Sequence, residues 1–184
     1  MKKLYSLLVL LSISVWGQQE PQYTQYMFNP TVINPAYAGS TGYGSLFSMY
    51  RAQWVGLEGA PRTMNLGYHQ PIENSHLGIG ANLLRDEIGP TSTTFAAVDV
   101  SYTIAFANES RLAFGIKAGG ELFNIDNQKL KNFNPDDPFL QQNMVNQFSP
   151  NIGVGLYYYT ENSYLGLSVP RLLETRFYDA IAYS

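Results

Sequence analysis

Cysteine is absent from the 184-residue sequence, and charged residues make up only 14% of it. Without thiols the chain cannot form a disulfide scaffold, a thiolate zinc site or a cysteine nucleophile. Soluble proteins carry charge on about a quarter of their residues, so this charged fraction is low for a surface that faces water. The formal net charge of −3 argues against a general nucleic-acid binder, and we expect no nucleic-acid partner.

Long hydrophobic runs are also missing beyond the first residues, so we expect no transmembrane helix in the remainder of the chain. At the N-terminus, Lys2 and Lys3 precede a short apolar run that ends near Gly17. A basic start, a short apolar core and compact residues before a cleavage point are typical of a secretory signal peptide. We therefore predict that residues 1–17 are removed on export. The alternative is an N-terminal anchor helix, for which the run is short.

Apolar residues alternate with polar or small ones through most of the remaining chain, and this period of two indicates β-strands. In residues 111–123, for example, Leu112, Phe114 and Ile116 fall on one face, and Lys117 and Glu121 fall on the other with several glycines. The same pattern predicts an all-β fold of seven strands, in residues 43–54, 63–69, 76–84, 94–104, 111–123, 151–159 and 164–169.

Such alternation suits both a soluble β-sandwich and a membrane β-barrel, and the connections help to choose between them. Short turns at residues 71–75, 106–110 and 160–163 alternate with longer links at 55–62, 85–92 and 126–147. Outer-membrane barrels show this pattern, with short periplasmic turns, long outer loops and aromatic residues near the strand ends. We predict an antiparallel up-and-down transmembrane β-barrel, integral to the outer membrane and in contact with its lipid. Residues 18–41 would form an N-terminal periplasmic or plug segment, and residues 42–184 a partial barrel.

An odd number of strands is unusual for this architecture, because bacterial barrels of one chain have an even number. An open sheet edge in lipid would leave unpaired backbone groups, each of which costs several kcal/mol. We therefore expect the sequence to be the N-terminal part of a longer barrel. Self-association that supplies the missing strands is the alternative.

The inner face and the N-terminal segment carry the candidate functional residues. Arg51, Asp99, Lys117 and Glu121 are predicted to face the lumen, either as a salt-bridge network that fills it or as the constriction of a passive diffusion porin. Residues 22–39 are unlike a strand, because Pro30 and Pro35 remove backbone donors. This segment could be a plug that buries its aromatic residues, or a strip that docks a periplasmic partner; those aromatics include Tyr26, Phe28 and Tyr37.

Catalytic, cofactor and metal signatures are missing from the sequence. Glycine pairs such as Gly78 and Gly80 do not continue into a dinucleotide-binding loop, and no serine has histidine and aspartate at a suggestive spacing. We expect a protein that is not an enzyme and that uses no cofactor or metal.

Several short motifs together resemble the PorP/SprF family of outer-membrane proteins from Bacteroidetes. They are QYMFNP at residues 25–30, NPAYAG at 34–39, RAQWVG at 51–56, GAPRT at 59–63, LRD at 84–86, IGP at 88–90 and LGLSVP at 165–170. The resemblance extends over nearly the whole chain after the signal peptide. Family members are longer, which agrees with the expected truncation.

The resemblance implies an outer-membrane barrel of the type IX secretion system. Relatives belong to the secretion and gliding machinery, or help to export or anchor large secreted adhesins at the cell surface. Machinery components and adhesin cargo are therefore the implied partners. The matched positions become candidates for architecture or partner binding: Asn29, Pro30, Asn34 and Pro35 in the N-terminal segment, and Arg51, Gln53, Trp54, Gly56, Gly59 and Pro61 in the first outside loop.

Overall fold

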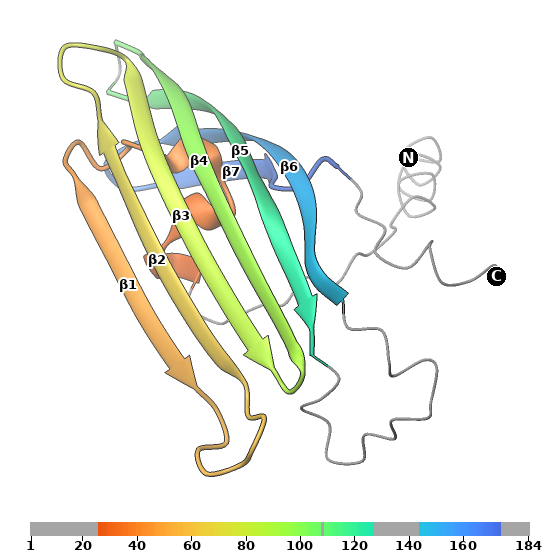
Figure 1. Ribbon diagram of the computed structural model, residues 1–184. Coiled ribbons are helices and arrows are strands. Elements are labelled where there is room, and N and C mark those ends of the chain that lie inside the picture. The colour runs from red at the N-terminus through yellow and green to blue at the C-terminus, as the bar shows by residue number, and fades with distance from the viewer. Residues whose placement is uncertain (1–25, 108, 127–143, 174–184) are drawn as a thin grey trace, which may run out of the picture.

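The computed structural model describes residues 26–107, 109–126 and 144–173, so the predicted signal peptide and most of the 126–147 link lie outside the described residues. Seven strands form one antiparallel sheet in chain order, which confirms the all-β prediction. Their bounds are β1 Ser45–Ala52, β2 Arg62–Pro71, β3 Leu77–Ile88, β4 Thr91–Ala105, β5 Arg111–Ile125, β6 Met144–Tyr159 and β7 Tyr164–Val169. Figure 1 shows these strands side by side.

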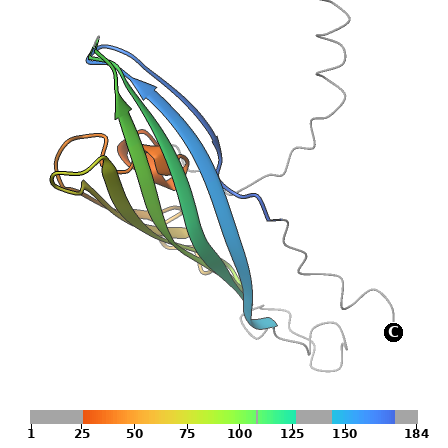
Figure 2. The same cartoon turned by 90° about the horizontal axis from the view of Figure 1, so that it is seen from above.

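The sheet curls into a half-barrel whose concave side holds the N-terminal part of the described chain (Figures 1 and 2). Three short 3-10 helices lie there: η2 Tyr26–Phe28, η3 Pro30–Val32 and η4 Pro35–Tyr37. We call residues 26–39 the N-terminal strip. None of the described helices is long and apolar enough to cross a membrane.

The two faces of the sheet have opposite polarity. Side chains on the convex face are apolar and exposed; they include Leu66, Val98, Val100, Ile116 and Val154. Buried side chains on the concave face are mainly polar, among them Asn65, Asn82, Asp99, Ser101 and Lys117. All seven strands belong to the same sheet, and in the described residues no second sheet covers the apolar face. This arrangement is the reverse of a soluble β-sandwich, which buries its apolar face.

One predicted link proved wrong. We expected a long connection at residues 85–92, but β3 continues to Ile88 and β4 begins at Thr91, so only Gly89 and Pro90 join them. Gly89 has a φ of 56°, a conformation that glycine adopts without the steric cost of a side chain. The polar residues at 85–87 and 91–94 lie in long strands that extend past the apolar part of the sheet.

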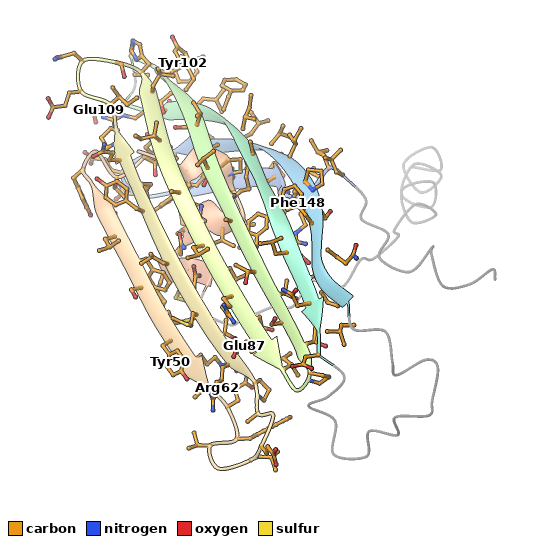
Figure 3. The ribbon with its side chains drawn as sticks, in the orientation of Figure 1. Tyr50, Arg62, Glu87, Tyr102, Glu109 and Phe148 are labelled. Carbon is orange, nitrogen blue, oxygen red and sulfur yellow. The ribbon has the colours of Figure 1, made fainter. Side chains whose placement is uncertain are left out.

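The two ends of the half-barrel differ in their connections. The tight turns at 72–76 and 160–163 lie at the end where Tyr102 and Glu109 are found in Figure 3, and the β1–β2 loop lies at the opposite end with Tyr50, Arg62 and Glu87. We call these the turn end and the loop end. After β7 the chain bends toward the concave side, where the Leu172 amide donates to the Ile152 carbonyl at 2.8 Å.

Candidate functional site

The candidate site is the contact between the N-terminal strip and the concave wall. Prolines shape the strip, because a fixed φ and a missing N–H suit the first turn of a helix. Pro30 begins η3 and Pro35 begins η4. Asn34 precedes η4, and its side-chain oxygen accepts a hydrogen bond from the Ala36 amide at 3.0 Å. The strip is thus a chain of single helical turns with its own caps.

A buried amide cluster joins the first half of the strip to β2 and β3. The Asn29 side-chain nitrogen donates to the side-chain oxygens of Asn65 at 3.3 Å and Asn82 at 3.2 Å. The Thr31 hydroxyl donates to the Asn29 side-chain oxygen at 2.6 Å, with the Asn82 side-chain oxygen 3.0 Å away. Burying polar groups is favourable only when they are hydrogen-bonded, so each of these side chains depends on the others.

The cluster continues into a buried ion pair between neighbouring strands. Asp99 on β4 and Lys117 on β5 face each other in the sheet register, and each is only 1% exposed. Lys117 Nζ lies 3.1 Å from Asp99 Oδ1 and donates to the Thr31 carbonyl at 2.7 Å. Asn82 donates to Asp99 Oδ2 at 2.6 Å. The ammonium group therefore connects the strip to a carboxylate on the wall.

Glycines on the inner face make room for the strip. A Cβ atom at Gly115 would overlap the backbone of Pro35 and Ala36, and one at Gly78 would overlap the Ala38 carbonyl. At Gly155 it would overlap the Asn34 side chain, and at Gly67 that of Asn29. Because these four positions have no side chain, they form a groove in the inner face of the sheet, and the strip lies in this groove.

The second half of the strip contacts the wall near the turn end. The Ser101 hydroxyl donates to the Ala38 carbonyl at 2.6 Å, and the Gly39 amide donates to His69 Nδ1 at 3.3 Å. The Tyr37 ring lies edge-on to His69 and Tyr157, with centroid distances of 5.4 and 5.3 Å. Burial raises the pKa of the Tyr37 phenol above its ordinary value.

The predicted strip residues divide into wall contacts and exposed groups. Asn29, Asn34 and Pro35 are buried against the wall, and Pro30 and Tyr37 are half-buried. Phe28 is 61% exposed, although its ring stacks on Phe47 with 6.5 Å between centroids. Tyr26 belongs to η2, but its side chain lies outside the described part of the structure.

The predicted loop residues lie apart from the strip, around the connection between β1 and β2. The Gln53 amide donates to the Pro61 carbonyl at 3.0 Å and closes the loop. Trp54, with a φ of 50°, and Gly56, with a φ of 97°, shape its tip, where Trp54 is 68% exposed. The carbonyl of Gly59 accepts from the Gly89 amide at 2.9 Å, which ties the loop to the β3–β4 turn. Pro61 is buried.

The remaining inner charges lie nearer the loop end. Glu121 pairs with Arg171, whose Nη1 is 2.6 Å from the carboxylate, and the Arg171 guanidinium lies 5.2 Å from the centre of the Phe95 ring. Arg51 on β1 is half-buried on the concave side. The structure therefore joins Asp99 with Lys117 and separates both from Glu121, which has a different partner.

Sequence reasoning missed several of the contacts that matter most. Thr31 and Arg171 carry no local signal, because each becomes significant only through a partner far along the chain. Asn65 and Asn82 could have been noticed, since each occupies an inner position on a strand whose neighbouring inner positions toward the turn end are glycine or histidine. The inner glycines were assigned to the correct face, but their role as a groove for the strip was not foreseen.

A family profile described as type IX secretion system membrane protein PorP/SprF matches residues 15–183. The chain belongs to the PorP/SprF family. This result confirms the resemblance seen in the short motifs. Membership of the PorP/SprF family implies that the chain is a membrane component of the type IX secretion system. No match was found among curated proteins or among solved structures.

The arrangement in this PorP/SprF chain is suited to holding a segment in place. The Lys117 ammonium and the Ser101 hydroxyl donate to strip carbonyls, and the Asn34 side chain of the strip donates to the Leu156 carbonyl of the wall. Within the described residues, no group of three histidine, aspartate or glutamate side chains is placed to hold a metal ion.

Proposed function

We propose that this chain forms part of the wall of a β-barrel integral to the outer membrane, with its convex face in lipid. The observation that carries this proposal is the exposed apolar convex face opposite a buried polar concave face. In a barrel that spans a membrane, outward positions contact lipid and inward ones line a polar interior.

The height of the apolar face supports the same proposal. Outward side chains of β5 are apolar or small from Leu112 to Leu122, which corresponds to about 33 Å along a strand at about 3.3 Å per residue. A tilt of about 40° reduces this to about 25 Å, the height of the apolar band of an outer-membrane barrel. At the loop end the face becomes polar, where Arg85 pairs with Glu87 at 2.6 Å.

Within type IX secretion, we propose a binding role that is not enzymatic: the barrel helps to export or anchor secreted surface proteins such as adhesins, and contacts other secretion or gliding components. Family membership supports this assignment. The use of the inner polar residues supports it too, because Asn82 and Lys117 bond to the strip residues Asn29 and Thr31, and Asp99 bonds to both Asn82 and Lys117. These wall residues therefore hold the strip and do not line an open chamber.

A passive diffusion porin is the second candidate, and the inner charges are the observation behind it. Three of those four charges are paired in the structure, Lys117 with Asp99 and Glu121 with Arg171, and the strip occupies the concave side. Both features favour a closed lumen. A steady open channel formed by the full-length protein in planar bilayers would favour the porin instead.

Deleting the gene tests the secretion role. We expect loss of surface adhesin or of secreted proteins from the medium, with rescue by the wild-type gene. Unchanged surface and secreted protein levels would contradict the role.

Fractionation tests the location separately. The protein should remain in the outer-membrane fraction after a high-salt wash and require detergent for release. Release as a soluble periplasmic protein would refute the membrane proposal.

A further inference from the structure

The N-terminal strip has a definite direction along the wall. At its carboxyl end, Gly39 lies beside Gly78 and donates to His69. At its amino end, Asn29 bonds to Asn65 and Asn82. Along β2 the contact moves from residue 69 to residue 65, and along β3 from residue 78 to residue 82. Both steps lead away from the turn end and toward the loop end.

Contacts on β5 give the same direction. The middle of η4 packs on Gly115, whereas Thr31, which precedes it in the chain, accepts from Lys117. Because β5 starts at the turn end, residue 117 is nearer the loop end than residue 115. In Figure 1 the three short helices follow each other along the strands, with η4 nearest the turn end and η2 nearest the loop end.

The two ends of the strip differ in what they expose. At the amino end, Met27 is 75% exposed and Phe28 is 61% exposed, and the Phe28 ring stacks on Phe47 of β1, which pairs with Gly67 at the level of the amide cluster. Near the turn end, the chain leaves the wall through residues 40–44 and enters β1 at Ser45, and Tyr43 is exposed there.

Short turns of outer-membrane barrels face the periplasm and longer loops face outward. Given the proposed outer-membrane location, on which this step rests, we infer that the amino end of the strip, with Met27, is directed toward the outer mouth, and that the chain following its carboxyl end, with Tyr43, is directed toward the periplasm.

The absence of cysteine from the sequence allows a direct test, since every introduced thiol is the only one. Met27→Cys and Tyr43→Cys are made in the full-length protein and expressed in cells. Val55→Cys at the β1–β2 loop and Glu161→Cys at the β6–β7 turn serve as controls for the two ends, because both positions are exposed. A membrane-impermeant maleimide is applied to intact cells and to cells with a permeabilised outer membrane.

We expect Met27→Cys to be labelled in intact cells, like Val55→Cys, and Tyr43→Cys to be labelled only after permeabilisation, like Glu161→Cys. The reverse pairing would overturn the inference. So would a Met27 thiol that reacts only in denatured protein, since it would not be accessible at either mouth. If the two controls show no difference in sidedness, the membrane proposal fails. If the controls differ and Met27 follows Glu161, the membrane proposal stands and the direction of the strip is wrong.

Discussion

The buried pair of Asp99 and Lys117 gives the sharpest test of how the strip is held. Replacing Lys117 by Met removes two interactions. The Asp99 carboxylate, on a residue that is 1% exposed, loses its charged partner, and the Thr31 carbonyl loses its hydrogen-bond donor. Breaking a buried ion pair on one side costs about 3–5 kcal/mol, because the other charge stays buried without a partner. Asp99→Asn should cost a similar amount, since it leaves the ammonium group uncompensated.

The double variant, Asp99→Asn with Lys117→Met, distinguishes pairing from packing. Both charges are then absent, so we expect it to lose about 2 kcal/mol less than the sum of the two single variants, a coupling typical of residues in contact. The assay is urea unfolding of the full-length protein in detergent, followed by tryptophan fluorescence. The exposed pair of Arg85 and Glu87 is the matched control, and its coupling should be about 0–1 kcal/mol.

Additive effects of Asp99→Asn and Lys117→Met would refute this reasoning. Additivity would mean that the two charges do not interact in the folded protein, although the structure places them 3.1 Å apart. Equal coupling in the buried and exposed pairs would also count against it, because burial would then have no effect on the strength of the pair.

Two further predictions concern the groove and the convex face. Gly115→Ala should lower the free energy of unfolding by about 1–3 kcal/mol in the same assay, since overpacking costs that much and the new Cβ would overlap Pro35 and Ala36. Gly44→Ala is the control, because only the side chains of Tyr68 and Gln70 are near that position. Equal effects at both positions would contradict a groove at Gly115. Ile116→Arg, midway along the convex face of β5, should cost about 2–4 kcal/mol in lipid, and Leu112→Arg, near the turn end, about 0–1 kcal/mol. Refolding into lipid vesicles measures both free energies, and a cost that does not change with depth would argue against lipid on this face.

The sequence alone determined the strands and their faces. Alternation is a local property, because each side chain points opposite to its neighbour along a strand, so Leu112, Ile116 and Lys117 could be assigned to their sides without any partner. Turn lengths were less secure. The expected link at 85–92 contains polar residues that suggest a loop, yet those residues pair across long strands joined by Gly89 and Pro90.

Tertiary structure decided what the inner residues do. Nothing local to Lys117 indicates that it bonds to the carbonyl of Thr31, which is 86 positions away in the chain. The partner of Glu121 also depends on where the chain turns after β7. These contacts follow from the curvature of the sheet and from the path of the strip across it. Both are set by the sum of many distant contacts, whereas the alternation that marks a strand is fixed by the geometry of adjacent residues.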